Sequence, residues 1–365
     1  MTENFENKIS RLELTNFTCF SEASFEFRSG INVFIGENGT GKTHILKLLY
    51  AMANNGRKEY INFPLPSQPT AHKLMRVAFA ISDYFNKQRF SLQELWRQQS
   101  KKSLLKIYLF INKNNKIFIS STNSGSSYNM DSDYVNPDEI LPNKSILFLP
   151  PNEMISWSKG FINLYQNKEV GFEKIYYDLA LALDGPLLRN GAKEEAEKLL
   201  SEIKAALDIE VEKKDGQYLI KYKNNAAINA AMNATGINKL AQIIYLIMNG
   251  SLTKDSILFW DEPEVNLNPK YISLVAKFLQ TLSKSGVQIF VATHDYLLIH
   301  QLSLAAEYRE QTDAPPMRFF SLQKDENGTI VESGDTLVQI NNNAILDEYA
   351  AFYDLETSLF AKSRK

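Results

Sequence analysis

The stretch GENGTGKT at residues 36–43 lies between an apolar run, INVFI at residues 31–35, and a helical pattern that begins at Thr43. Strand, glycine-rich loop and helix in this order form the context that a phosphate-binding loop requires. Glycines let the backbone turn tightly and bring its N–H groups close to phosphate oxygens, and the N-terminus of the helix directs positive charge to the same oxygens. A glycine-rich turn can match this pattern by chance, but the flanking strand and helix favour nucleotide binding.

Two side chains of this loop have specific roles in phosphate binding. Lys42 is expected to neutralise the β and γ phosphates, and the Thr43 hydroxyl is expected to ligate Mg²⁺. We expect nucleotide contacts from Gly36, Asn38, Gly39, Thr40, Gly41, Lys42, Thr43 and His44.

A second apolar run, ILFW at residues 257–260, is followed directly by Asp261 and Glu262. Two adjacent carboxylates at the end of a buried strand are costly without a functional reason. Asp261 can hold the Mg²⁺ shell, and Glu262 can orient and deprotonate an attacking water molecule. The alternative is an acid-rich surface turn, which the four apolar residues before it make unfavourable.

A helix and a further strand follow these carboxylates. Pro269 opens the helix, Gly286 closes it, and residues 287–292 form a strand that ends just before His294. Strand, helix and strand make a right-handed unit with two parallel strands, so Glu262 and His294 meet at the sheet edge that carries the phosphate-binding loop. We expect His294 to reach the γ-phosphate or the attacking water as a sensor, in preference to a structural role.

The segment NATGINKLA at residues 233–241 ends at the start of an apolar helix. The Thr235 hydroxyl and Gly236, at the N-terminus of that helix, form a candidate second anion site. The alternative is an ordinary helix with Thr235 as its N-cap, and the segment taken alone favours this alternative.

The amino-acid composition excludes several classes of protein. The 365 residues have a formal net charge of -2, which excludes a global basic field. The single cysteine, Cys19, excludes an internal disulfide framework and a multi-cysteine metal site. No apolar run approaches the length of a membrane span and the N-terminus is polar, so we expect a cytoplasmic protein without membrane contact. A basic cluster at Arg97, Lys101, Lys102 and Lys106 leaves local nucleic acid contact open, although such clusters are more often solvated.

Two pairs of residues are left with open alternatives. Phe17 and Phe20 either pack in the core, which aromatic residues favour, or stack on the nucleotide base. Asn152 and Glu153 follow a strand at residues 145–149. Either one of them faces the metal or the γ-phosphate, or the two form a plain turn. The other predicted elements are strands at 9–14 and 23–28, helices at 71–100, 162–184 and 191–207, a hairpin of strands 104–111 and 116–120, a hairpin at 208–223 that turns at Asp215-Gly216, and a mobile loop at 120–132.

The order of these motifs resembles that of the ABC-type ATPases of the RecF, SMC and OLD group, in which two ATPase heads enclose two ATP molecules. DEPEVNLNP at residues 261–269 is similar to the DEPExxLHP stretch of the OLD-like, AAA_21-type ATPases, with Asn268 in place of the usual His. The resemblance implies that Thr235 and Gly236 contact the γ-phosphate of an ATP bound to the other head. The residues implied to flank this contact are Asn238 and Lys239.

For the fold, the resemblance implies an α/β P-loop NTPase of the ABC-ATPase type, with a mixed sheet, an antiparallel β-subdomain and a helical insertion subdomain. Residues 1–54 and 233–365 are expected to form the ATPase core. Residues 55–150 are expected to be an inserted region of helix and hairpin, and residues 151–232 a helical lid with a hairpin.

For function, the resemblance implies an enzyme that binds and hydrolyses ATP with Mg²⁺ and closes as a homodimer around ATP, with a higher assembly left open. Lys42, Glu262 and His294 are the expected catalytic residues. The chain has no HNH-type histidine cluster and no room for a Toprim nuclease, so it is similar to the ATPase-only subunits of the anti-phage systems Septu, PARIS and retron-associated modules, which control a separate nuclease or toxin. The alternatives are a RecF-like clamp on duplex DNA, a scaffold that binds ATP with little turnover, and a nuclease.

Overall fold

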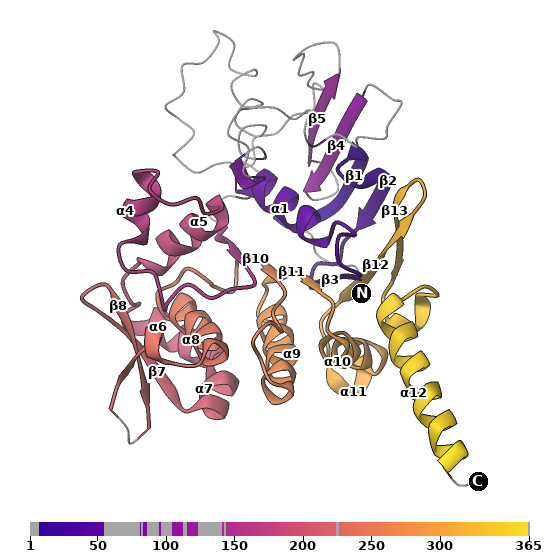
Figure 1. Ribbon diagram of the computed structural model, residues 1–365. Helices are drawn as coiled ribbons and strands as arrows, with labels where there is room; N and C mark the ends of the chain where they lie inside the picture. The colour runs from indigo at the N-terminus through magenta and orange to yellow at the C-terminus, as the bar shows by residue number, and fades with distance from the viewer. Residues whose placement is uncertain are drawn as a thin grey trace.

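In the computed structural model of the protein, a six-stranded mixed sheet crosses the middle of the molecule (Figure 1). Its strand order is β13-β12-β3-β11-β10-β6, with parallel pairing from β12 to β6 and antiparallel pairing between β13 and β12. The strands are β3 (Ile31–Gly36), β6 (Ile146–Leu149), β10 (Ile257–Asp261), β11 (Gln288–Thr293), β12 (Met317–Asp325) and β13 (Gly328–Gly334). The structure describes residues 7–54, 81, 83–85, 95, 104–111, 115–122, 141, 144–223 and 226–363.

A smaller, four-stranded antiparallel sheet lies above the first, in the order β2-β1-β4-β5 (Figure 1). The helix α1 (Lys42–Ala53) lies between the two sheets and shares one hydrophobic core with both, in which Phe25, Phe34 and Phe320 are fully buried. The small sheet consists of β1 (Ile9–Phe17), β2 (Phe20–Glu26), β4 (Leu104–Ile111) and β5 (Asn115–Thr122). The predicted hairpin between β4 and β5 is confirmed.

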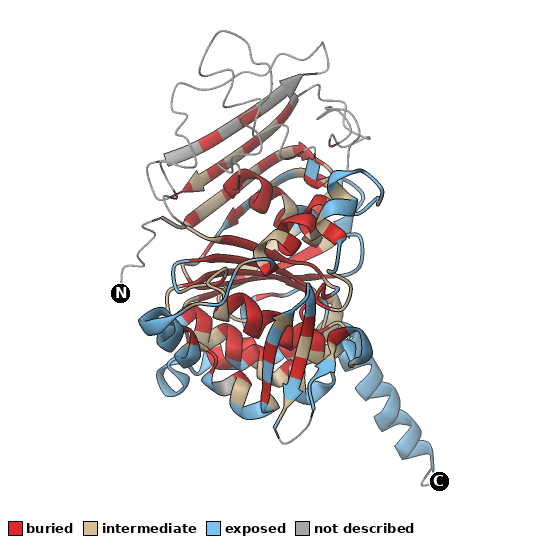
Figure 2. Ribbon diagram, turned by 90° about the vertical axis from the view of Figure 1, so that its left-hand side faces the viewer, coloured by how far each residue is buried: buried red, intermediate tan, exposed pale blue. Residues whose placement is uncertain are grey.

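Three helices cover the lower face of the large sheet: α8 (Thr235–Met248), α9 (Pro269–Lys284) and α10 (Tyr296–Glu307) (Figure 1). The strands β3, β10 and β11 are buried along their whole length, as expected for parallel strands covered on both faces of the sheet. Figure 2 shows this buried layer. The Asn268 side chain accepts a hydrogen bond from the Tyr271 N–H and Pro269 occupies the first turn, so α9 begins where the sequence predicts.

The helices between residues 161 and 207 are shorter than predicted. Two helices were expected at 162–184 and 191–207, whereas the chain forms four. The first expected helix is interrupted because Lys168 has a left-handed backbone (φ 58°), and the second breaks at Leu200. The four helices are α4 (Phe161–Gln166), α5 (Lys174–Leu183), α6 (Asn190–Leu199) and α7 (Ser201–Leu207).

The hairpin that follows these helices is confirmed. Asp215 (φ 50°) and Gly216 (φ 73°) form its turn, with the two positive φ angles that such a hairpin requires. The strands β7 (Ile209–Lys214) and β8 (Gln217–Tyr222) form a small sheet with β9 (Ile228–Asn229), which leads through a 3₁₀ turn (Ala230–Met232) into α8.

The described strands between residues 55 and 150 belong to the two sheets. β4 pairs with β1, and β6 pairs with β10 at the edge of the large sheet. This region therefore contributes strands to both sheets, and its expected status as an inserted region stays a prediction. Most of the helix predicted at 71–100, most of the loop predicted at 120–132 and the basic residues Arg97, Lys101 and Lys102 lie outside the described residues, and Lys106 lies on β4.

A long helix, α12 (Ala344–Ser363), extends away from the rest of the molecule (Figure 2). It follows a short α11 (Arg309–Thr312), the β12–β13 hairpin and a 3₁₀ turn (Leu337–Gln339). None of its residues is buried. Among the described residues, no helix is both long and apolar enough to span a membrane.

Candidate nucleotide site

The loop between β3 and α1 requires glycine where the chain passes close to other segments. A Cβ atom at Gly36 (φ 145°) would lie 2.2 Å from the Leu322 carbonyl oxygen, and one at Gly41 (φ 99°) would lie 2.5 Å from the Cys19 Sγ. The Thr40 hydroxyl donates to the Glu37 carbonyl at 2.9 Å and is buried. The loop is thereby fixed from within, which suits the preorganised backbone N–H groups that bind phosphate.

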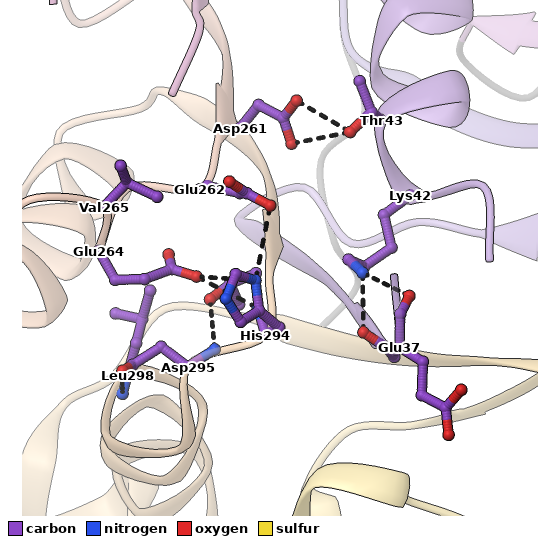
Figure 3. A network of polar contacts seen from close by, with 12 residues as sticks. Glu37, Lys42, Thr43, Asp261, Glu262, Glu264, Val265, His294, Asp295 and Leu298 are labelled. Atoms are coloured by element: carbon purple, nitrogen blue, oxygen red, sulfur yellow. Dashed lines mark hydrogen bonds and ion pairs between the residues drawn. The ribbon is translucent and has the colours of Figure 1, made fainter. Parts of the chain in front are cut away.

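Lys42 is buried at the first position of α1 (Figure 3). Its ammonium donates to the carbonyl oxygens of Gly36 at 2.7 Å and Glu37 at 2.9 Å. Burial lowers the pKa of Lys42, and the nearby carboxylates of Glu262 and Asp261 oppose this shift. Phosphate oxygens can take the place of these two carbonyl oxygens as acceptors.

Thr43 and Asp261 meet across the site, as predicted (Figure 3). The Thr43 hydroxyl lies 2.9 Å and 3.2 Å from the two carboxylate oxygens of Asp261. A hydroxyl and a carboxylate that converge in this way are ligands suited to a hard cation such as Mg²⁺. Within the described ranges no group of three or more His, Cys, Asp or Glu side chains is placed to hold a metal ion.

We expect Asp261→Asn to make the fold more stable at pH 8 but not at pH 4. Burial raises the pKa of Asp261 from 3.8 to about 6. The folded state then binds the proton more tightly than the unfolded state, so stability is lost as the pH rises from about 4 through 6. Asn removes a penalty of up to about 3 kcal/mol at pH 8 and keeps an oxygen for Thr43. Melting temperatures in EDTA at the two pH values measure this effect. Asp255→Asn, on an exposed side chain, is the matched control, and equal gains at both pH values would contradict the expectation.

Glu262 and His294 come together at the ends of β10 and β11, as predicted (Figure 3). The Glu262 Oε1 lies 3.5 Å from the His294 Nδ1. Glu262 has a left-handed backbone (φ 47°) and its N–H donates to the Ala292 carbonyl at 2.8 Å. Positive φ at a residue other than glycine is strained and is found preferentially at functional sites.

Glu264 is a site residue to which the sequence interpretation gave no role. Its Oε1 accepts the His294 backbone N–H at 3.2 Å and lies 3.6 Å from the His294 Nδ1. Burial raises the pKa of Glu264, and hydrogen bonds from Thr293 and His294 oppose the shift. The signal was available in the sequence, because Glu264 is the third carboxylate of the DEPE stretch.

Lys239 and Asn238 face the interior of their own subunit, whereas they were expected to flank a γ-phosphate. The Lys239 ammonium donates to the carbonyls of Glu262 at 2.7 Å and Val265 at 3.2 Å, and burial lowers its pKa to about 8. The Asn238 amide donates to the Ala230 carbonyl at 2.7 Å. Lys239 therefore links α8 to the loop that carries Glu262.

Glu153 also faces inward. Its carboxylate accepts hydrogen bonds from the Ser156 hydroxyl at 2.5 Å and the Ser156 N–H at 3.1 Å, and the Asn238 amide lies 3.4 Å away. Asn152 hydrogen-bonds with Tyr176. The Glu153 carboxylate is therefore held by neighbouring donors and is not directed at a metal or a phosphate. Asn152 is exposed at a bend in the chain, and its role as a ligand stays a prediction.

Thr235 is the first residue of α8 and is exposed. The N-cap is Ala234, without a side-chain hydrogen bond, so the interpretation of Thr235 as an N-cap is wrong. A Cβ atom at Gly236 would lie 2.4 Å from the Asn266 carbonyl oxygen. Glycine is therefore needed here for packing within the subunit, independently of any contact with a second one.

Four further candidates are Phe17, Phe20, His44 and Asn38. Phe17 and Phe20 are fully buried, so the core interpretation is correct and base stacking is wrong. The Phe20 ring lies against Gly41 and helps to shape the loop. His44 is exposed on α1 with its ring centroid 5.3 Å from that of Phe85, and Asn38 is exposed in the loop.

Adjacent strand ends thus bring together a phosphate-binding loop, a Thr–Asp pair and a Glu–His pair. With the antiparallel sheet above α1, this arrangement defines an α/β P-loop NTPase of the ABC-ATPase type, in the group that includes RecF and SMC. The chain belongs to the AAA_21 family, described as "AAA domain, putative AbiEii toxin, Type IV TA system", whose profile matches residues 31–300.

Similar proteins agree with this assignment. The DNA replication and repair protein RecF of Flavobacterium johnsoniae is 44% identical over 64 residues, which are 18% of this chain and 17% of that protein. RecF of Clostridium novyi is 52% identical over 42 residues, 12% of each chain. The matches thus span less than a fifth of these relatives.

Solved structures show the same fold over nearly the whole chain. The Smc head domain of Pyrococcus furiosus with an extended coiled coil, bound to the C-terminal domain of ScpA, has a TM-score of 0.53 at 14% identity and covers 98% of this chain and 99% of that one. An SmcHead bound to the C-winged helix domain of ScpA has a TM-score of 0.53 at 13% identity, covering 89% and 97%.

Proposed function

We propose that this protein is an ATP-binding and ATP-hydrolysing switch that dimerises around ATP and controls a partner effector protein in defence against phage. The observation that carries the ATPase part is the meeting of Lys42, Thr43, Asp261, Glu262 and His294 at neighbouring strand ends. This set supplies phosphate binding, a cation site and a base, which are the parts that phosphoryl transfer to water requires.

The chain's own residues have separable roles in hydrolysis. The loop amides and Lys42 bind the phosphates, and Thr43 and Asp261 hold Mg²⁺, which neutralises phosphate charge when bound. Glu262 orients the attacking water and accepts its proton. His294 lies beside the Glu262 carboxylate and holds the water and the γ-phosphate in register.

We propose that a second copy completes each site through Thr235 and Gly236. The exposed N-terminus of α8 has no side-chain cap, so its first backbone N–H groups are available to an anion. The similarity of the fold to SMC heads supports a pair of heads with ATP between them.

Mixing two inactive variants tests this pairing. Lys42→Ala lacks the phosphate-binding loop function, and Thr235→Arg blocks the end of α8 with a bulky side chain. Thr235 is chosen because Gly236 is also needed within its own subunit. Each variant alone is expected to be inactive, and a one-to-one mixture recovers up to about a quarter of the wild-type rate, since half of the random dimers carry one complete site out of two. A mixture no more active than its components would contradict completion in trans.

The control of an effector rests on the family and on the neighbours of the fold. The family description names toxin–antitoxin systems, and both SMC heads are bound to a second protein, ScpA. The test is to co-express the chain with the products of adjacent genes, and to measure whether phage protection requires both a partner and a functional Lys42.

The RecF matches favour one alternative, a clamp on duplex DNA. ATP turnover that rises with duplex DNA, and DNA binding that falls steeply with salt, would support the clamp in place of the effector switch. Turnover unchanged by DNA, together with partner-dependent protection, would support the switch.

A further inference from the structure

The helix α12 is attached to the molecule only by its first turns, as far as the described residues show. The ring centroids of Tyr349 and Tyr296 lie 4.2 Å apart, and Ile345 and Leu346 pack against the core. Every residue from position 347 to 363 is exposed (Figure 2). The helix therefore projects as an exposed arm of about four turns beyond its base.

This arm carries a broad apolar face that is exposed. Large apolar side chains between 54% and 68% exposed recur on it. With about 100° of rotation per residue, these side chains spread over roughly half of the helix surface. Phe352 and Leu359 are seven residues apart and therefore lie in one column along the helix. Exposed contiguous apolar surface of this kind marks an interaction site. The side chains are Tyr349, Phe352, Tyr353, Leu355 and Leu359.

The charges at one edge of this face indicate what covers it. Glu348 and Lys362 lie seven residues, about two turns, before and after Leu355, so the three form one column. If a second α12 lies antiparallel with the symmetry axis at Leu355, each Glu348 faces a Lys362 of the other copy. In a parallel pair these two side chains would be about 21 Å apart along the axis and could not meet.

We propose that α12 is a dimerisation helix, which pairs antiparallel with α12 of a second copy of this chain around a two-fold axis at Leu355. The exposed apolar side chains of the two helices form the buried interface. Two Glu348–Lys362 contacts determine the direction and the register of the helix pair. Glu356 lies inside the apolar face and opposes the association, so that the contact is reversible. This contact needs no nucleotide and is separate from the ATP-dependent pairing of heads.

Sedimentation of the full chain without nucleotide, in the Lys42→Ala background, tests the proposal independently of the ATP site. A dimer is expected, and Phe352→Ser with Leu359→Ser makes it a monomer. Val338→Ser, at an apolar side chain 79% exposed outside α12, is the matched control and leaves the dimer intact. Glu356→Leu is expected to tighten the dimer. A nucleotide-free chain that remains monomeric at about 100 μM, or a dimer that survives the double substitution, overturns the proposal.

Charge exchange tests direction and register. Glu348→Lys and Lys362→Glu are each expected to weaken the dimer about tenfold, because two contacts become repulsive, and the double exchange restores it. In mild oxidant, a mixture of Glu348→Cys and Lys362→Cys forms a disulfide between subunits, whereas either variant alone does not. Cross-linking of Glu348→Cys with itself would show a parallel pair and would refute this arrangement.

Discussion

Replacing Glu262 with Gln is expected to lower the rate of ATP hydrolysis by a factor of at least about 100, the usual contribution of a positioned general base. Gln keeps the shape of the side chain but cannot accept a proton from water. Binding of ATP should persist, because Lys42, Thr43 and Asp261 are unchanged, and the ATP-bound dimer should accumulate. Phosphate release and sedimentation with ATP measure the two effects.

The matched control for this substitution is Glu326→Gln, on an exposed carboxylate in the β12–β13 turn, which should hydrolyse ATP at the wild-type rate. A Glu262→Gln variant that also turns over at the wild-type rate would show that the base is another group. If instead the variant loses ATP binding, Glu262 acts by holding the site together rather than in the chemical step.

Replacing Lys42 with Ala is expected to weaken ATP binding by a factor of about 100 or more, since charge-assisted hydrogen bonds to phosphate are among the stronger polar contacts. The ammonium is already buried at the loop and desolvated, so it exchanges one set of acceptors for another. Titration with a fluorescent ATP analogue measures the affinity. Lys270→Ala, at the exposed start of α9, is the control, and equal affinities in the two variants would contradict the assignment.

The parts of the site that the sequence predicts are those determined by chain order. β3, β10 and β11 are mostly apolar strands followed by polar residues, and parallel strands bring such ends to one edge of the sheet. Thr43 with Asp261 and Glu262 with His294 follow from that rule.

The parts that the sequence does not predict depend on contacts without a local pattern. Lys239 donates to backbone carbonyls of a loop more than twenty residues further along the chain, and no periodicity indicates such a bond. The break near Lys168 arises because one residue adopts a left-handed backbone within an otherwise helical pattern. Asn238 and Glu153 are polar residues that turn inward to satisfy each other and the backbone, and polarity alone suggests exposure.

The packing of Gly236 on Asn266 and the bonds from Lys239 to the Glu262 loop make the tip of α8 and the loop carrying the base one stiff unit. If a second head contacts the N-terminus of α8, a displacement there is transmitted directly to Glu262 of the same subunit. Hydrolysis of the two ATP molecules in a dimer would then be coupled. A mixed dimer with one complete site would hydrolyse ATP at less than half of the wild-type rate. The difference between the measured rate and half of the wild-type rate gives the strength of the coupling between the two sites.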